Sequence, residues 1–177
     1  MKLKYALSTA LLAISLSITA PAMADDWDTA MSHYDNQNYN QAFSIFKRLA
    51  EQGNASAQYN LGVMYDEGLG VKQDDAQAVW WYQKSAEQGY ADAQFNLGNM
   101  YYNGQGIRQS HANAMTWWKK AYTQGHAKAT YNIGILYDNG DSVHQNKSTA
   151  KKWYGEACDL GHQGGCNEYR KLNQAGY

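Results

Sequence analysis

The sequence has almost no proline: of its 177 residues, only Pro21 is one. A second residue that it uses sparingly is cysteine, with two copies. The turns that follow residue 21 therefore depend on glycine and asparagine, which tolerate unusual backbone angles.

Charge is also scarce, and neither sign dominates. Charged residues make up 18% of the chain, and the formal net charge is −1. A nucleic-acid-binding protein would need a basic stripe or patch, which the sequence lacks. We therefore expect no nucleic-acid partner.

Motifs for catalysis are missing as well. The five histidines are scattered, and His126 and His162 share a repeat position at which Tyr90 also stands, which argues against a required imidazole. No serine lies in a nucleophile elbow or an SxxK setting. Gly68 and Gly70 lack the third glycine and the preceding strand of a phosphate-binding loop. We predict no catalytic residue, no metal site, no cofactor and no enzymatic activity.

Long apolar runs are absent except at the N-terminus. Lys2 and Lys4 precede a run from Ala6 to Ile18, and Ala22-Met23-Ala24 gives a small-x-small end. This pattern is typical of a secretory signal peptide, here residues 1–24, with cleavage after Ala24. The run is too short for a comfortable membrane span, and no cysteine follows the expected cut. We therefore expect a periplasmic or secreted protein without a membrane anchor.

The dominant feature is a stretch that occurs three times with a period of 36 residues and no gap, as residues 57–92, 93–128 and 129–164. Self-similarity at such a period is typical of a solenoid built from one supersecondary unit. In each copy, apolar residues recur with helical spacing twice, and glycines such as Gly68 and Gly89 follow the two segments. The sequence therefore predicts an all-α solenoid of helix-turn-helix units.

Small residues inside the first helix of each unit indicate close helix crossing. Gly62, Gly98 and Gly134 lie mid-helix, where glycine costs roughly 1 kcal/mol relative to alanine. We expect the aligned indoles to be their bulky partners, namely Trp81, Trp117 and Trp153. The turn after the third first helix has Ser142 where the others have Gly70 and Gly106, so we expect it to differ locally or to be strained.

The ends of the array resemble partial units. Residues 25–56 place Ala42 and Phe46 where Ala78 and Tyr82 stand one period later, which predicts an N-terminal capping repeat. Residues 165–177 match the start of a further first helix, with Leu172 in the core position, and no second helix follows. We interpret this segment as a C-terminal capping half-repeat and tail.

The two cysteines, Cys158 and Cys166, lie across the last helix junction in ACDLGHQGGC. An even cysteine count in an exported chain favours a disulfide, which would hold the least supported junction together. A redox pair or a metal pair are the alternatives, but the CxxC spacing that would support either is absent.

The repeated pattern AxYNLGxxYxxGxGVxQDxxxAxxWYxKAAEQGxAxAQ closely resembles the Sel-1-like repeat family, a branch of the tetratricopeptide-type solenoids. The resemblance is strong over residues 57–164, and the opening unit looks more like an ordinary tetratricopeptide repeat. ACDLGHQGGC is similar to a bridged junction of cysteine-rich secreted members. The resemblance implies a right-handed α/α superhelix, a concave face lined by the first helices, and an adaptor or regulator role in the bacterial envelope.

If the first helices line the concave face, as the resemblance implies, a set of side chains recurring in each unit points into the groove. These are Tyr59, Asn60, Val63, Asp66, Phe95, Asn96, Asn99, Tyr102, Tyr131, Asn132, Ile135 and Asp138. The repeated asparagines could bind a peptide backbone, because an amide donates and accepts at once. Alternatively they bond within the repeat and fix its packing. Positions that vary between units, such as Val63, Asn99 and Ile135, are better candidates for specificity.

The preferred functional hypothesis is a monomeric, non-enzymatic scaffold that holds a peptide or protein partner of the cell envelope. A second hypothesis is a protein that binds cell-wall fragments or β-lactams, with weak β-lactamase-like activity, as some cysteine-rich relatives suggest. The missing SxxK serine counts against it. A third is a folded module whose partner is expressed only under stress.

Overall fold

The computed structural model describes residues 20–177, with side chains from Asp25 onward. This part of the chain contains nine helices and no strand. Residues 1–19 of the predicted signal peptide (residues 1–24) lie outside the described residues. Its last five residues, 20–24, form the start of helix α1 (Ala20–Asp35). Over the described range, no helix is both long enough and apolar enough to cross a membrane.

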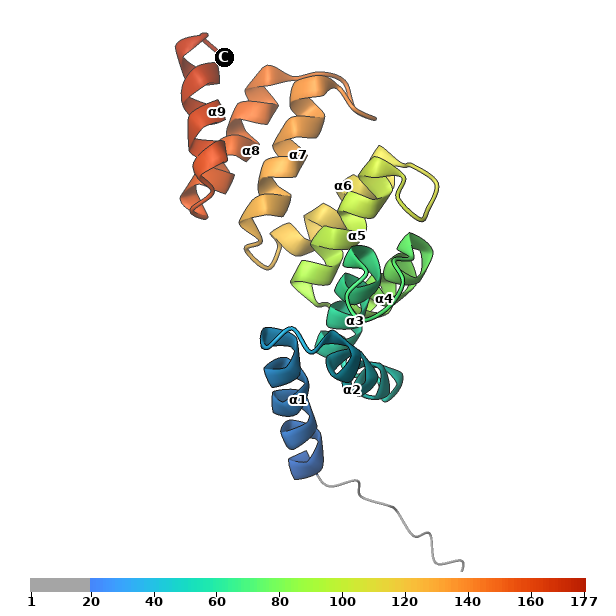
Figure 1. Cartoon of the computed structure of the whole chain (residues 1–177). Coiled ribbons are helices and arrows are strands. Elements are labelled where there is room, and N and C mark those ends of the chain that lie inside the picture. Colours follow the sequence, from blue (N-terminus) through green and yellow to red (C-terminus); the bar gives the residue numbers. More distant parts are fainter. Residues whose placement is uncertain (1–19) are drawn as a thin grey trace, which may run out of the picture.

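The helices pack mainly on their neighbours in the chain, and the pairs stack in order from α1 at one end to α9 at the other (Figure 1). The helices after α1 are α2 (Tyr39–Glu51), α3 (Ala55–Glu67), α4 (Asp75–Glu87), α5 (Ala91–Asn103), α6 (His111–Tyr122), α7 (Ala127–Asn139), α8 (Lys147–Asp159) and α9 (Gln163–Gln174). The predicted all-α solenoid is therefore confirmed. We call α3, α5 and α7 the first helices and α4, α6 and α8 the second helices of the repeats.

The second helices begin with equivalent side-chain caps. The side chains of Asp74, Ser110 and Asn146 each accept a hydrogen bond from the backbone N–H three residues later. Such a cap stabilises a helix by about 1 kcal/mol, because it satisfies a donor that has no partner within the helix.

Each first helix ends at a residue in the left-handed conformation, namely Gly68, Gly104 and Gly140. Two residues later the backbone again has a positive φ, +67° at Gly70, +63° at Gly106 and +58° at Ser142. Glycine is required at 106 for a further reason, since a Cβ there would lie 2.3 Å from the Asp75 backbone. Ser142 keeps the left-handed angle, so the strain expected at this turn is present.

The core repeats with the sequence. Buried alanines and larger apolar residues of each first helix cluster with buried residues of the helix that precedes it, and these residues are Ala57, Leu61 and Met64, then Ala93, Leu97 and Met100, then Ala129, Ile133 and Leu136. A fully buried leucine or methionine contributes about 1.5–3 kcal/mol. Stability therefore comes from successive small interfaces between units.

The predicted partners of the mid-helix glycines are wrong by one residue. A Cβ at Gly62, Gly98 or Gly134 would lie 2.4–2.7 Å from ring atoms of Tyr82, Trp118 and Tyr154, the residues that follow the three predicted tryptophans. Consecutive residues point about 100° apart around a helix. Trp81, Trp117 and Trp153 consequently face the core of the preceding unit, while their neighbours cross the glycines.

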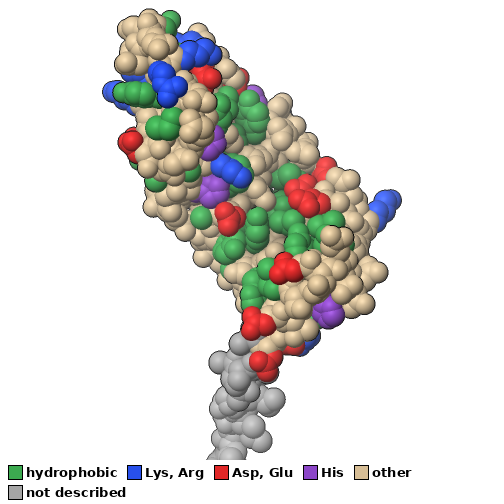
Figure 2. Space-filling model, turned by 60° about the vertical axis from the view of Figure 1, so that its left-hand side comes forward, with side chains coloured by type: hydrophobic (Ala, Val, Ile, Leu, Met, Phe, Trp, Pro, Cys, Tyr) green, Lys and Arg blue, Asp and Glu red, His purple; other side chains and the backbone are tan. Residues whose placement is uncertain are grey.

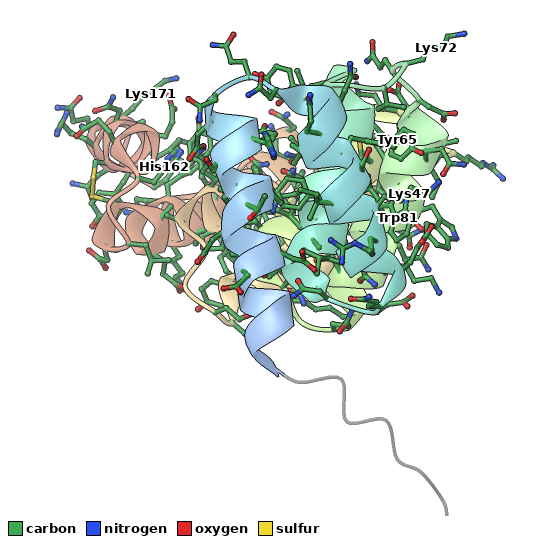
Figure 3. The ribbon with its side chains drawn as sticks, turned by 60° about the horizontal axis from the view of Figure 1, so that its bottom comes forward. Lys47, Tyr65, Lys72, Trp81, His162 and Lys171 are labelled. Carbon is green, nitrogen blue, oxygen red and sulfur yellow. A yellow bond between two sulfur atoms is a disulfide. The ribbon has the colours of Figure 1, made fainter. Side chains whose placement is uncertain are left out.

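Both ends of the array are tied down. In the opening unit, Ala42 and Phe46 are fully buried, and the Trp27 ring packs edge-on against Phe46 with a centroid distance of 5.6 Å. At the other end, Leu172 is buried. A disulfide between Cys158 and Cys166 joins α8 to α9, the two helices that flank the labelled His162 (Figure 3). The predicted structural bridge is confirmed.

Candidate functional site

Figure 2 shows one face of the molecule on which hydrophobic, acidic and histidine side chains gather. Side chains of the first helices contribute to two pockets. The first groove pocket, of about 420 Å³, is lined by residues from α3, α5 and the start of α7, namely Tyr59, Asp92, Phe95, Asn96, Gly125, His126, Ala127 and Lys128. The second groove pocket, of about 190 Å³, is lined by Asn99, Tyr102, Asn103, Trp118, Asn132 and Ile135.

The structure brings only part of the predicted groove set to these pockets. All twelve predicted side chains are half-buried. Tyr59, Phe95 and Asn96 line the first groove pocket, whereas Asn99, Tyr102, Asn132 and Ile135 line the second. The remaining members lie outside both, and these are Asn60, Val63, Asp66, Tyr131 and Asp138.

Ring pairs connect neighbouring units along this face. Tyr59 packs against Tyr90 at a centroid distance of 5.1 Å. At the two equivalent places, Phe95 stacks on His126 at 4.6 Å, and Tyr131 stacks on His162 at 4.4 Å. In each pair a residue of one first helix meets the residue that begins the next one. The ring pairs therefore set the relative position of adjacent repeats.

Both histidines in these pairs also cap helices. The Nδ1 atom of His126 accepts from the Ala129 N–H at 3.2 Å, and that of His162 accepts from the Gly165 N–H at 3.1 Å. The Nε2 atom of His126 lies 3.2 Å from an Asp92 carboxylate oxygen. Burial lowers the pKa of His162, and the charge of Lys128 acts in the same direction. Both side chains thus have structural roles.

The repeated asparagines use their amides in different ways. The Nδ2 of Asn60 donates to the Ser56 carbonyl of its own helix at 2.9 Å. The Nδ2 of Asn132 donates across the repeat boundary to the Asn99 Oδ1 at 3.3 Å. Asn96 lies between Tyr59 and Tyr82, and its hydrogen bonds with their hydroxyls oppose the effect of burial on their pKa values. The amides of these repeated asparagines therefore already form hydrogen bonds within and between repeats.

Acidic groups of the groove set bond to the second helices. The Tyr82 hydroxyl donates to Asp66 at 3.1 Å, and the Tyr154 hydroxyl donates to Asp138 at 3.4 Å. Burial raises the pKa of Asp66, and it raises the pKa of Tyr59 to about 12. The Tyr59 phenol therefore remains a protonated donor at neutral pH.

In the middle repeat, both members of this tyrosine–carboxylate pair are different residues. Trp118 stands in place of the tyrosine, and its Nε1 donates to the Phe95 carbonyl and to the Asn99 Oδ1, both at 3.2 Å. Tyr102 stands in place of the carboxylate and packs 5.5 Å from the Trp118 ring. Asn99 thus accepts from two donors, Trp118 and Asn132, and its orientation in the second groove pocket is fixed.

Sequence reasoning missed three exposed polar residues of the pockets, Asp92, Asn103 and Lys128. They stand outside the repeated positions from which the groove set was chosen. Their common signal is that each lies at an end of a first helix, where the side chain can reach the neighbouring unit. Among the described residues, His, Cys, Asp and Glu form no group of three or more that could hold a metal ion.

Four consecutive segments match the model of the Sel1 repeat, residues 34–54, 55–90, 91–126 and 127–162. The chain belongs to the Sel1 repeat family. Each full repeat in this frame begins two residues before the ranges 57–92, 93–128 and 129–164 that we expect from the sequence. Sel1 repeat proteins are in general protein-interaction scaffolds and are typically non-enzymatic.

Solved structures support the fold. A Sel1 repeat protein from Oxalobacter formigenes is 37% identical, with a TM-score of 0.75 over 82% of this chain and 58% of that one. A protective antigen of uropathogenic Escherichia coli with the same fold is 30% identical, with a TM-score of 0.82 over 86% of this chain and 33% of that one. This Sel1 repeat chain thus spans 58% and 33% of the lengths of these two relatives. Comparison with curated proteins finds no significant match.

Proposed function

We propose that this protein is a non-enzymatic scaffold of the bacterial cell envelope that holds an extended segment of a protein partner against its first helices. The observation that carries the proposal is the pair of groove pockets, each lined by side chains of neighbouring repeats. Adjacent pockets on a repeating surface suit a ligand that is itself extended and that contacts one unit after another.

The chemistry of the pockets favours a peptide as that ligand. The first groove pocket combines two aromatic rings, Tyr59 and Phe95, with the amide of Asn96 and with charged groups of both signs, Asp92 and Lys128. The second combines the amides of Asn99, Asn103 and Asn132 with Tyr102 and Ile135. Amides pair with a peptide backbone because they donate and accept, and apolar walls accommodate side chains.

Two observations favour a location in the envelope. The disulfide between Cys158 and Cys166 is of a kind that persists in oxidising compartments such as the periplasm. Residues 1–24 have the composition of a signal peptide. Within the envelope, the partner would be a sensor, a cell-wall enzyme, an assembly complex or a toxin. The scaffold would regulate this partner, connect it to other proteins or, for a toxin, act as its immunity protein, and it would need no cofactor.

Substitution of exposed pocket residues tests the proposal without disturbing the core. Lys128 and Asn103 are exposed and line the two groove pockets. The double variant Lys128→Glu with Asn103→Trp changes the charge of one pocket and blocks the other. The matched control changes exposed residues of helix α6, as Lys119→Glu with Thr116→Trp.

Both variants, tagged and produced in the native envelope, would be captured after brief crosslinking and compared with the wild type. The proposal predicts that a stoichiometric partner is lost with the groove variant and kept with the control. Equal recovery from all three proteins, with unchanged circular dichroism, would contradict binding at the first helices.

A further inference from the structure

A further pocket lies between two second helices, away from the groove pockets described above. It has a volume of about 490 Å³ and is lined by Tyr122, Thr123, Gly125, Glu156, Asp159 and Leu160. These residues come from the end of α6, the turn after it and the end of α8. We call it the α6–α8 pocket. Gly125 is the one residue that it shares with a groove pocket.

The equivalent places at the two earlier repeat junctions contain paired glutamines. The Gln88 Nε2 donates to the Gln58 Oε1 at 2.7 Å, and the Gln124 Nε2 donates to the Gln94 Oε1 at 2.9 Å. At the third junction the corresponding residues are Thr130 and Leu160. Thr130 is fully buried and its hydroxyl donates instead to the His126 carbonyl. The side-chain bridge is therefore replaced by an apolar wall.

Leu160 and Tyr122 give the α6–α8 pocket its apolar surface. Leu160 is 42% exposed, although leucine is apolar. The equivalent residues of the two earlier units are the polar Gln88 and Gln124. Gly125 has no side chain to cover it, and the Leu160 Cδ2 lies 3.9 Å from the place that a Cβ at residue 125 would take. The Tyr122 ring is held edge-on against Trp153 at a centroid distance of 4.9 Å.

In the first two units, a lysine of the second helix lies over a tryptophan ring of the same helix. The Lys84 ammonium lies 5.3 Å from the centroid of the Trp80 ring, and the Lys120 ammonium lies 3.9 Å from that of Trp117. Lys84 and Trp80 also line the pocket at the first junction, between α2 and α4. In the third unit the residue equivalent to Lys84 and Lys120 is Glu156. The described cation–π pairs accordingly stop at the second unit.

The rim of the α6–α8 pocket is acidic. Glu156 and Asp159 are three residues apart on α8, so their side chains are neighbours on the helix surface. Neither takes part in an ion pair among the residues that the structure describes. A hydrogen bond to Glu156 raises the pKa of Tyr122, which places this carboxylate at the aromatic wall.

We propose that the α6–α8 pocket binds an arginine side chain exposed on a partner protein. The guanidinium would bond the Glu156 and Asp159 carboxylates, and the aliphatic stem and planar head would pack on Leu160 and Tyr122. Arginine fits better than lysine, because its planar group stacks on aromatic rings and bonds carboxylates in pairs. The partner then supplies the cation that the first two units carry themselves. This assignment is independent of the groove proposal, since the two sites have only Gly125 in common.

A blocked tripeptide, acetyl-Gly-Arg-Gly-amide, is the probe for this site. Its matched control contains citrulline, which keeps the shape of arginine and removes the charge. Each would be titrated into the isotope-labelled, disulfide-bonded protein while backbone amide resonances are followed by NMR. We expect saturable shifts centred on Gly125 and Leu160, with affinity for the arginine peptide about tenfold higher than for the citrulline peptide, as a charge-assisted hydrogen bond implies.

Two variants locate the effect. Glu156→Gln with Asp159→Asn keeps the shape of the rim and should remove the preference for arginine, whereas Glu51→Gln at the pocket of the first junction should leave it unchanged. Shifts that map elsewhere, equal affinity for both peptides, or a preference that survives the double substitution would each overturn the proposal. Self-association that depends on Glu156 and Asp159 would assign the arginine to a second copy of this chain and would also overturn it.

Discussion

Gly98 lies directly beneath the indole of Trp118, so that a Cβ at residue 98 would be 2.4 Å from the ring atoms Cδ1 and Nε1. Trp118 cannot move aside easily, because it is buried and its Nε1 is bonded to the Phe95 carbonyl and to Asn99. This contact joins the core of the middle repeat to the second groove pocket. It explains why the helix keeps a glycine at a cost of roughly 1 kcal/mol in helix propensity.

We therefore predict that Gly98→Ala destabilises the protein by about 1–3 kcal/mol, the range for an overpacked core, despite the better helix propensity of alanine. Urea unfolding followed by circular dichroism measures the change. The control is Gly155→Ala in α8, where a Cβ would meet the exposed Tyr169 ring at 3.1 Å and this ring can shift. A neutral or stabilising Gly98→Ala would show that the crossing is looser than described.

The turn at Ser142 offers a stabilising change. Ser142 has a φ of +58°, whereas the residues at the equivalent turns are glycines. Because a left-handed angle costs a residue with a Cβ roughly 1–2 kcal/mol, Ser142→Gly should stabilise the third repeat by about 1 kcal/mol. The reverse change, Gly106→Ser, should be strongly destabilising, because its Cβ would overlap the Asp75 backbone. Thermal unfolding of both variants tests the pair, and an unchanged Ser142→Gly midpoint would argue against strain.

The disulfide should stabilise one end of the array. It closes a short loop between α8 and α9, because the sequence separation of Cys158 and Cys166 is only 8. In the chain-entropy picture such a loop contributes about 2.5 kcal/mol. We expect the double variant Cys158→Ser with Cys166→Ser to speed hydrogen exchange in α9 and to leave exchange in α3 to α6 unchanged. Uniform acceleration along the chain would mean that the repeats unfold as one unit.

His162 should make the same end sensitive to acid. Its folded-state pKa is lowered from 6.5, chiefly by burial, and its Nδ1 accepts the hydrogen bond that caps α9. The unfolded chain therefore binds a proton more readily than the folded one. The stabilisation is complete above pH 6.5 and is lost as the pH falls through the lowered pKa.

The variant His162→Asn keeps a capping oxygen but cannot titrate. We predict that the fall in Tm between about pH 7.5 and about pH 5.5 is smaller in this variant than in the wild type. The groups that face His162 are the Tyr131 ring and the Lys128 charge, and neither changes in the variant. An identical fall in both proteins would place the acid sensitivity elsewhere.

The repeat pattern was enough to predict the helices and their glycine ends, because these depend on local chemistry that recurs with the period. The disulfide was predicted separately, from the even cysteine count in a chain with the pattern of a signal peptide. The partner of Gly98 was predicted wrongly, since a shift of one residue turns a side chain by about 100° and periodicity does not show which of two adjacent aromatics faces inward. The structure assigns Trp118 to the glycine and Trp117 to the preceding unit.

The candidate site was harder to predict, because it depends on which side chains of different repeats meet. Asn60 and Asn132 occupy the same repeat position, yet one bonds its own helix and the other reaches Asn99 in the unit before it. Asp92 and Lys128 occupy one repeat position with opposite charges, and both line a single pocket. A comparison of repeats position by position cannot reveal such pairs.

The central claim is that the partner lies against the first helices. Placing a photoreactive benzoylphenylalanine at Lys128, and in a parallel strain at Thr116 on α6, tests it most directly, because both positions are exposed and lie on different layers of the solenoid. After irradiation of living cells, the account predicts one discrete crosslinked protein from position 128 and none from position 116. Crosslinking of the same protein from position 116 alone would contradict the account.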